Sequence, residues 1–213
     1  MIIVLLGPPG AGKGTQGDRL ADRLGIPKIA TGDVLRAAVR AGSEQGRLAQ
    51  GYMDRGELVP DEVILGIMKS ALAEPAAARG AILDGVVRTV PQAEGLKRVL
   101  HELGRRLDAV LLFEVGEDEL VRRLGQRTVC EGCQTPYTGI DAGAQCEKCG
   151  GRLVRRKDDE PEAIRTRMRA YWEQTAPVLD WYMAHGDGAR VITVDAEGPV
   201  DEVTARVVRE LET

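Results

Sequence analysis

The feature that most constrains this chain is a glycine-rich turn that directly follows an apolar run. Ile2–Leu6 is a continuous aliphatic run that predicts a buried strand, and residues 7–15 read Gly-Pro-Pro-Gly-Ala-Gly-Lys-Gly-Thr. The amphipathic segment that follows predicts a helix opening at Lys13. Glycines let the backbone wrap closely around a phosphate, and a helix N-terminus adds about half a positive charge. The sequence therefore predicts a phosphate-binding loop in which Lys13 reaches the β- and γ-phosphates of a nucleotide.

The rest of the chain alternates short apolar runs with helical patterns. Such alternation predicts an α/β fold in which helices flank a five-stranded parallel sheet on both faces. Strands are expected at residues 2–6, 28–30, 81–83, 109–113 and 191–194, and helices at 13–24, 34–41, 44–54, 62–73, 92–103, 118–124, 161–184 and 200–211.

Composition argues against several classes of protein. The longest apolar runs have about five residues, whereas a membrane helix needs about 20, so no membrane-spanning helix is expected. The first residues lack the basic start of a signal peptide, so we expect a cytoplasmic protein. A net charge of −4 and 3% aromatic residues argue against a nucleic-acid surface. Neither Ser43 nor Ser70 lies in a Gly-x-Ser-x-Gly elbow, which argues against a serine hydrolase.

All four cysteines lie in one polar, glycine-rich segment. Cys130 and Cys133 form one C-x-x-C pair, Cys146 and Cys149 form another, and 12 residues separate the pairs. Four thiolates at this spacing favour a tetrahedral Zn²⁺ site with bonds of about 2.3 Å. With no histidine nearby, a structural ion that holds a small inserted lobe together is favoured over a catalytic one. Two disulfides or an iron–sulfur centre are the alternatives.

The phosphate loop departs from the common G-x-x-x-x-G-K-[ST] pattern. Gly14 stands where a magnesium-binding hydroxyl usually lies, and the hydroxyl follows at Thr15. This version of the loop resembles that of the adenylate kinase family of nucleoside monophosphate kinases. The resemblance continues in order along nearly the whole chain, through residues 31–36 (Thr-Gly-Asp-Val-Leu-Arg), 56–62 (Gly-Glu-Leu-Val-Pro-Asp-Glu) and 83–89 (Leu-Asp-Gly-Val-Val-Arg-Thr).

The resemblance implies an enzyme that transfers a phosphoryl group reversibly from ATP to AMP. Two ADP would form by in-line attack, with Mg²⁺ and without a covalent intermediate. It also implies a core of residues 1–29, 60–126 and 161–213, a monophosphate-binding "helical lobe" at 30–59, and a zinc-bearing lid, the "cysteine lobe", at 127–160. Both lobes should close over the substrates and exclude water.

Two alternatives to this function remain open at this stage. One is a kinase for another monophosphate, namely UMP, CMP or GMP. The other is a nucleotide-dependent binding module that grips nucleic acid with its zinc ribbon. We expect a monomer whose partners are small nucleotides and which contacts neither nucleic acid nor a membrane.

Basic residues at family positions are expected to carry the catalysis. Two nucleotides repel each other, so the protein must neutralise and align their phosphates, and arginine does this through a planar fork of donors. The resemblance implies catalytic roles for Lys13, Asp84, Arg88, Arg123, Arg156 and Arg167. It implies ATP binding by Gly10, Ala11, Gly12, Lys13, Gly14, Thr15, Arg123, Arg127, Pro136, Tyr137 and Gly198. It implies AMP binding by Thr31, Arg36, Glu57, Leu58, Val59, Gly85, Arg88, Gln92, Arg156 and Arg167.

Several of these residues have more than one interpretation. Asp84 ends a predicted strand at the sheet edge that faces the ligand, where it would hold the waters of Mg²⁺, but it could instead cap a helix. The pair Asp158-Asp159 binds the lid to the donor side in the family, but it could also be a helix N-cap. Tyr137 would cover the donor adenine or pack inside the cysteine lobe. Thr31 and Gln92 carry the donors and acceptors needed to read an adenine edge. Arg165 and Arg169 are expected in solvent or in ion pairs.

Val86 and Val87 stand where the family has Phe-Pro. The resemblance implies a cis peptide bond before that proline. A cis bond costs about 2.5–4 kcal/mol before a residue other than proline, against roughly 0.5–1 kcal/mol before proline. We therefore predict a trans bond between Val86 and Val87, altered geometry at Gly85 and Arg88, and weaker AMP binding.

Overall fold

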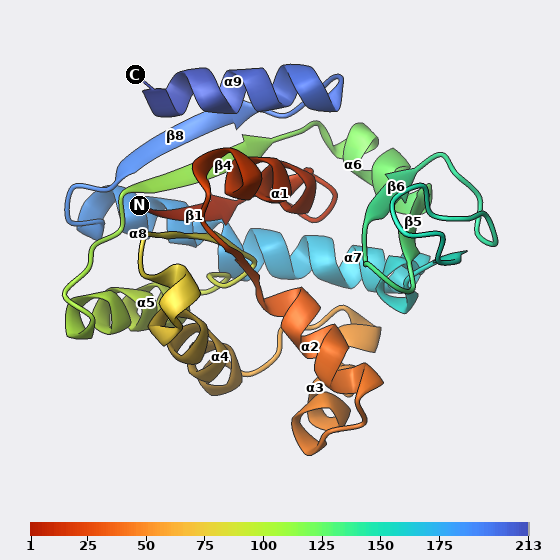
Figure 1. Ribbon diagram of the computed structural model, residues 1–213, viewed down its shortest axis with the longest axis horizontal. Coiled ribbons are helices and arrows are strands. Elements are labelled where there is room, and N and C mark those ends of the chain that lie inside the picture. The colour runs from red at the N-terminus through yellow and green to blue at the C-terminus, as the bar shows by residue number, and fades with distance from the viewer. Residues whose placement is uncertain (213) are drawn as a thin grey trace.

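A five-stranded parallel sheet forms the centre of the protein. The computed structural model describes residues 1–212, without the side chain of Gln45, so the last residue of the predicted core segment 161–213 lies outside the described residues. The strand order is β2-β3-β1-β4-β8, and each neighbouring pair is parallel, which confirms the expected fold class (Figure 1). The strands are β1 (Ile2–Leu6), β2 (Lys28–Ala30), β3 (Ala81–Asp84), β4 (Ala109–Glu114) and β8 (Arg190–Asp195).

Side chains of β1 alternate between two hydrophobic cores. Ile3 and Leu5 pack on the face covered by α1 and α9, whereas Ile2, Val4 and Leu6 pack on the face covered by α4, α5 and α8. Each strand is apolar on both sides because both faces are covered, and each fully buried aliphatic side chain contributes about 1.5–3 kcal/mol. The helices are α1 (Lys13–Leu24), α4 (Asp61–Ala73), α5 (Val90–Glu102), α8 (Pro177–His185) and α9 (Val200–Glu212).

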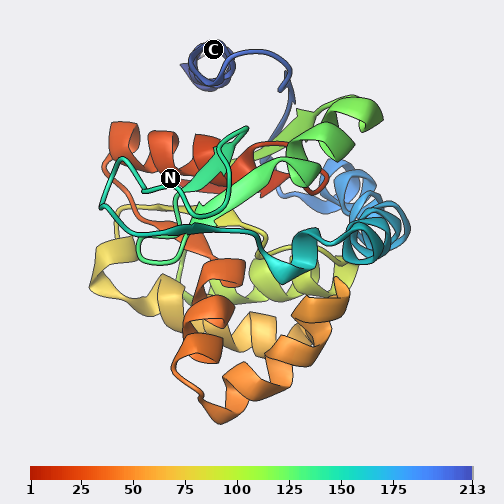
Figure 2. The same cartoon turned by 90° about the vertical axis from the view of Figure 1, so that its right-hand side faces the viewer.

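The helical lobe contains α2 (Thr31–Arg40) and α3 (Glu44–Arg55), which pack on each other away from the sheet (Figures 1 and 2). Leu35, Ala49, Val59 and Ile64 form a small core of their own there.

The cysteine lobe follows α6 (Glu117–Gly125) and precedes α7 (Pro161–Ala170). It holds an antiparallel sheet in the order β6-β5-β7, and in Figure 2 it faces the viewer. Its strands are β5 (Arg127–Cys130), β6 (Pro136–Thr138) and β7 (Leu153–Val154).

Two predicted helices differ from the structure by more than one or two residues at an end. Helix α2 begins at Thr31, three residues earlier than expected, because β2 passes directly into it without a turn. The single helix expected over residues 161–184 is interrupted by a π-helical segment, Tyr171–Thr175, in which the Ala176 amide bonds to the Tyr171 carbonyl five residues back. Pro177 lacks an amide hydrogen, so the regular ladder cannot continue through it, and α8 starts there anew.

The two rims of the sheet differ in what they carry. At the carboxyl rim the strands lead into the phosphate loop, α2, Asp84 and the loop at 196–199. At the amino rim the contacts stabilise the fold: the Ile2 backbone N–H, for example, donates to Asp108 Oδ2 at 2.6 Å. Within residues 1–212, no helix is both long enough and apolar enough to cross a membrane.

Candidate functional site

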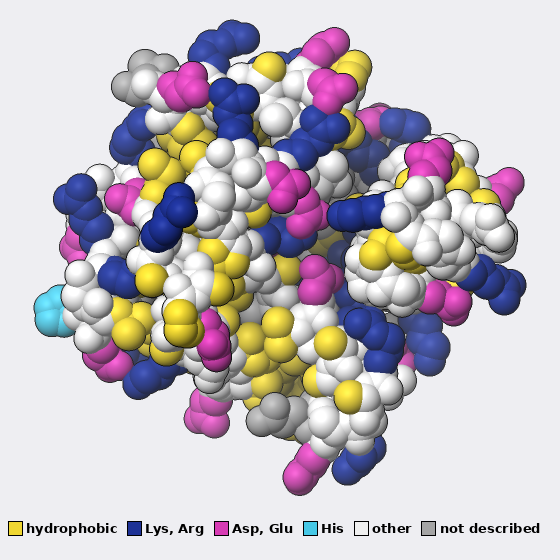
Figure 3. All heavy atoms as spheres, in the orientation of Figure 1, with side chains coloured by type: hydrophobic (Ala, Val, Ile, Leu, Met, Phe, Trp, Pro, Cys, Tyr) yellow, Lys and Arg dark blue, Asp and Glu magenta, His cyan; other side chains and the backbone are white. Residues whose placement is uncertain are grey.

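A cavity of about 620 Å³ lies along the carboxyl rim, between the sheet and both lobes. Figure 3 shows a hollow between the main body and the lobe on the right, with acidic and basic side chains along it. This volume is typical of small-molecule sites. All of the predicted nucleotide-site residues except Tyr137 line it: Gly10, Ala11, Gly12, Lys13, Gly14, Thr15, Thr31, Arg36, Glu57, Leu58, Val59, Asp84, Gly85, Arg88, Gln92, Arg123, Arg127, Pro136, Arg156, Arg167 and Gly198.

The phosphate loop is built on left-handed glycines. Gly10 and Gly12 have φ angles of 87° and 91°, which a residue with a side chain rarely adopts, and Gly12 caps α1. Lys13 Nζ folds back over the loop and donates to the carbonyls of Gly7 at 2.6 Å and Pro8 at 2.8 Å. Desolvation in the cleft, together with nearby arginines, lowers the pKa of Lys13 to about 7, although Asp84 partly opposes this. An anion bound at the loop would therefore stabilise the charged form of Lys13.

Arginines gather over the cavity from several elements. Burial is the main cause that lowers the pKa of Arg167 and that of Arg156, the latter to about 10, and neighbouring guanidinium groups add to it. Among the described residues, Arg36 Nε and Arg156 Nε are buried without a hydrogen-bond partner. Buried polar atoms normally have partners, so these two donors point to an anionic ligand that would supply them.

Carboxylates hold several arginines of the cavity in place. Arg36 pairs with Asp33, while Arg123 donates to Glu119 at 2.7 Å and to the Ala196 carbonyl at 3.0 Å. Hydrogen bonds from Arg122 and then Arg123 lower the pKa of Glu119 to about 2. The roles of Asp33 and Glu119 were not predicted, although their (i, i+3) and (i, i+4) spacings to arginines on one helix could have revealed both.

Asp158 and Asp159 tie the cysteine lobe to α7. Asp159 has a side chain 4% exposed, and it accepts from both Arg127, with Nε at 2.7 Å, and Arg167, with Nη1 at 2.9 Å. Asp158 Oδ2 lies 3.1 Å from Arg167 Nη1. Burial alone would raise the pKa of Asp158, but Arg167 and the other guanidinium groups outweigh it and lower the pKa. Since Glu160 occupies the N-cap of α7, the two aspartates act here as ion-pair partners.

One wall of the cavity contains a hydrogen-bonded network. Thr31 Oγ1 donates to the Gly85 carbonyl at 2.7 Å. Gln92 Oε1 accepts from the Arg88 amide at 2.7 Å, and Gln92 Nε2 donates to Asp61 Oδ1 at 2.7 Å. The role of Asp61 was not predicted, and no local spacing could have revealed it, because Asp61 lies 31 residues from Gln92.

Val86 and Val87 are buried, and Val87 lines the cavity. No peptide bond among the described residues is cis, so the predicted trans bond between these valines is confirmed.

Asp84 lies next to the phosphate loop. It ends β3 at the carboxyl rim, and a Cβ at Gly14 would lie 3.4 Å from its Oδ2. No helix starts at Asp84, and the next helix, α5, is capped by Thr89, so the helix-cap interpretation is wrong. A carboxylate next to the phosphate loop, in a cavity that Thr15 also lines, fits the oxygen ligands and bound waters that Mg²⁺ prefers.

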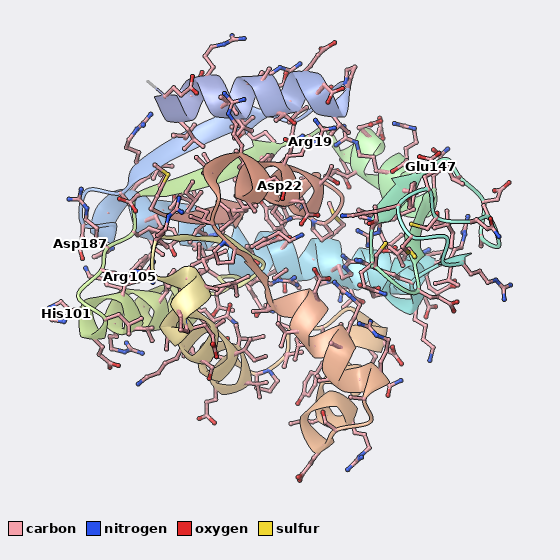
Figure 4. The ribbon with its side chains drawn as sticks, in the orientation of Figure 1. Arg19, Asp22, His101, Arg105, Glu147 and Asp187 are labelled. Carbon is pink, nitrogen blue, oxygen red and sulfur yellow. The ribbon has the colours of Figure 1, made fainter. Side chains whose placement is uncertain are left out.

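The four cysteine sulfurs converge in the cysteine lobe. All lie within 4.8 Å of one another, with Cys130 Sγ 3.4 Å from Cys149 Sγ and Cys133 Sγ 3.5 Å from Cys146 Sγ. A zinc tetrahedron with bonds of 2.3 Å places its sulfurs about 3.8 Å apart, so the arrangement fits this ion. The cysteines are not joined by disulfides. Figure 4 shows their sulfur atoms within the lobe on the right, near the labelled Glu147.

Tyr137 faces the cysteines instead of the cavity. Its hydroxyl lies 3.2 Å from Cys146 Sγ, and its ring packs with the core of the lobe. Its neighbour Pro136 and Thr138 line the cavity, as the alternation of a strand requires. The structure thus places the ring in the packing position.

Comparison with known proteins gives one consistent answer. The family model described as "Adenylate kinase" matches residues 5–187. The adenylate kinase of Gemmatimonas aurantiaca is 66% identical over 213 residues, which cover 99% of this chain and 99% of that protein. The adenylate kinase of Salinispora tropica is 47% identical, covering 98% and 96% of the two chains, and that of Archaeoglobus fulgidus is 46% identical, covering 96% and 97%.

Proposed function

The chain belongs to the adenylate kinase family, and we propose that its cavity holds ATP and AMP end to end while a phosphoryl group passes between them. Its activity is ATP:AMP phosphotransfer. The observation that carries our assignment of the site is the set of basic side chains that line one cavity from the phosphate loop, both lobes and α7, with donor atoms of Arg36 and Arg156 lacking partners.

The phosphate loop and its lysine are assigned to the donor nucleotide. Lys13 would leave the carbonyls of Gly7 and Pro8 and turn to the β- and γ-phosphates, which accept its hydrogen bonds better because they are charged. Arg123 and Arg127 lie at the end of α6 and the start of β5, where they would neutralise the same phosphates. Gly198, in the loop after β8, would contact the donor base through its backbone.

The acceptor is assigned to the side of the cavity that the helical lobe covers. Arg36 and Arg88 would bind the α-phosphate of AMP, and Arg156 and Arg167 would span the phosphate being transferred. In other phosphoryl-transfer enzymes one such arginine accounts for about 10³–10⁵ in rate. The acceptor oxygen is already ionised at neutral pH, so positioning and electrostatics carry the reaction and no general base is needed.

The carboxylates of the cleft share these arginines with the nucleotides. Asp33, Glu119 and Asp159 hold Arg36, Arg123 and Arg127 while phosphates are absent, so the cations are already oriented when substrate arrives. Mg²⁺ bound with ATP neutralises phosphate charge, and Asp84 and Thr15 are the residues that would hold it through bound waters.

The cysteine lobe is assigned a structural Zn²⁺ held by Cys130, Cys133, Cys146 and Cys149. The hydrophobic cluster of the lobe is small, and its buried members are Leu153 and two of these cysteines, so the metal bonds would replace hydrophobic burial. Unpaired, clustered cysteines suit a reducing compartment, which supports a cytoplasmic location. We also infer a monomer, since a single chain supplies both nucleotide sides of the cavity.

A coupled assay that records ADP formation from ATP and AMP tests the assignment. Replacing Arg88 by alanine should lower turnover by at least about 10³-fold. Arg165→Ala is the matched control, because Arg165 is an exposed arginine on α7 and should leave turnover unchanged. UMP, CMP and GMP as acceptors measure selectivity. Unaltered ADP production by Arg88→Ala would refute the assignment of the acceptor side.

A further inference from the structure

We propose that Asp61 is a positioning residue that makes the acceptor pocket selective for a 6-aminopurine by fixing the orientation of the Gln92 amide. This inference rests on the proposed function, in which Thr31 and Gln92 read the acceptor base. Asp61 is the first residue of α4, and it is not among the described residues that line the cavity, whereas Gln92 is. Asp61 therefore acts on the base through Gln92.

The Gln92 amide is held between two partners of opposite polarity. The Arg88 amide can only donate and bonds to Oε1 at 2.7 Å, while the Asp61 carboxylate can only accept and bonds to Nε2 at 2.7 Å. A half-turn of the amide would set oxygen against carboxylate and NH₂ against N–H. The Gln92 residue is 2% exposed, so water cannot repair such a mismatch. The amide thus offers the cavity one acceptor and one donor in a fixed order.

Thr31 adds a second fixed polarity. Its hydroxyl hydrogen is donated to the Gly85 carbonyl at 2.7 Å, so its oxygen presents only lone pairs to other groups. An adenine edge offers an amino donor at position 6 and an acceptor at N1, whereas a hypoxanthine edge reverses both. If position 6 of the base faces Thr31, only the 6-amino group of adenine can donate a hydrogen to it, because hypoxanthine has a carbonyl oxygen there. A pocket built to bond a particular donor rejects the analogue without it, because its own polar groups are left unpaired.

Asp61 is itself held by its surroundings. Thr89 Oγ1 donates to Asp61 Oδ1 at 3.2 Å, and the same Thr89 oxygen accepts from the backbone N–H of Gln92 at 3.2 Å. Asparagine at position 61 would keep the shape of this network but could present either an oxygen or an NH₂ group to Gln92. Asp61→Asn therefore removes the fixed polarity while preserving the packing.

The test compares AMP with IMP, which share the ribose and the phosphate, so arginine contacts cancel in the ratio. We expect Asp61→Asn to lower the AMP/IMP ratio of kcat/KM by at least about tenfold, mainly through KM. Glu62→Gln is the matched control, because Glu62 is an exposed carboxylate in the same turn of α4, and it should leave the ratio unchanged.

Two further measurements separate positioning from a general loss of structure. Asp61→Ser, which also removes the carboxylate and suits a first helical turn, should lower the ratio similarly, and calorimetric titration with AMP and IMP reads the same selectivity without turnover. In a Gln92→Met background, Asp61→Asn should change the ratio no further. An unchanged ratio in both Asp61 variants, or an equal loss in the Gln92→Met background, would overturn the proposal. Failure of the unaltered protein to form ADP from AMP would instead refute the proposed function.

Discussion

Replacing Asp159 by asparagine is expected to destabilise the nucleotide-free protein strongly. The Asp159 side chain is 4% exposed and neutralises Arg127 and Arg167 together, so its loss leaves two partly buried guanidinium groups facing each other. Asparagine keeps the size of the side chain and one acceptor oxygen, which confines the change mainly to the charge.

The magnitude follows from burial and from what remains nearby. Removing one partner of a buried ion pair costs about 3–5 kcal/mol. Asp158 still lies 3.1 Å from Arg167 and shields it in part, so we expect the lower end, about 3 kcal/mol. For a chain of this size that corresponds to a fall in Tm of about 6–12 °C.

Thermal unfolding with and without ATP measures this effect. Asp201→Asn is the control, because Asp201 on α9 pairs with Arg19 on α1 and its side chain is 87% exposed. Arg19 is labelled in Figure 4. Such a pair contributes at most about 1 kcal/mol. Phosphates should replace the missing carboxylate charge, so saturating ATP should raise the Tm of Asp159→Asn more than that of the unaltered protein. Equal Tm losses in the two variants, or a loss that ATP does not reduce, would refute the reasoning.

Three further results are expected. Desolvation in the cleft lowers the pKa of Lys13 to about 7, and phosphate should raise it again, so ATP binding at pH 8 should take up close to one proton. Calorimetry in buffers of different ionisation enthalpy measures this uptake, and heats that do not depend on the buffer would contradict it. Removing the metal with a chelator, or replacing Cys133 by serine, should unfold the cysteine lobe and lower the melting temperature of the protein. Metal analysis that finds no zinc in the reduced protein would exclude a structural zinc ion. Val87→Pro should tighten AMP binding in titration calorimetry, and an unchanged affinity would show that these valines do not weaken the AMP side.

Local patterns in the sequence predicted most of the elements. The run Ile2–Leu6 and its glycine-rich flank placed β1 and α1 correctly, since burial on both faces and a helix N-terminus leave clear signals over a few residues. The π-helical turn at Tyr171–Thr175 was missed because a bond to the fifth residue back leaves almost no mark on the hydrophobic period. Pro136 and Tyr137 were both predicted to bind ATP. Successive side chains of a strand point to opposite faces, so only one of the two could have been expected to face the cavity.

The site was predicted as a set of residues, but its connections were not. Motifs indicated which arginines face the cavity, yet the pairs Arg127–Asp159 and Asp61–Gln92 join residues about 30 positions apart. Such contacts depend on how α4, α5, α7 and the cysteine lobe pack in three dimensions. No spacing within one helix or strand can encode them.

Because the cavity lies at the carboxyl rim of the sheet, the amino rim is a suitable place to attach a label. Figure 4 shows His101 and Asp187 at one end of the molecule, on the side of the amino ends of the strands, and Glu147 of the cysteine lobe at the opposite end. A dye, a surface tether or an optical-trap linker attached there would lie far from the nucleotide cavity. Distances between such an anchor and a second label near Glu147 would then test, in single molecules, whether the cysteine lobe opens and closes as expected.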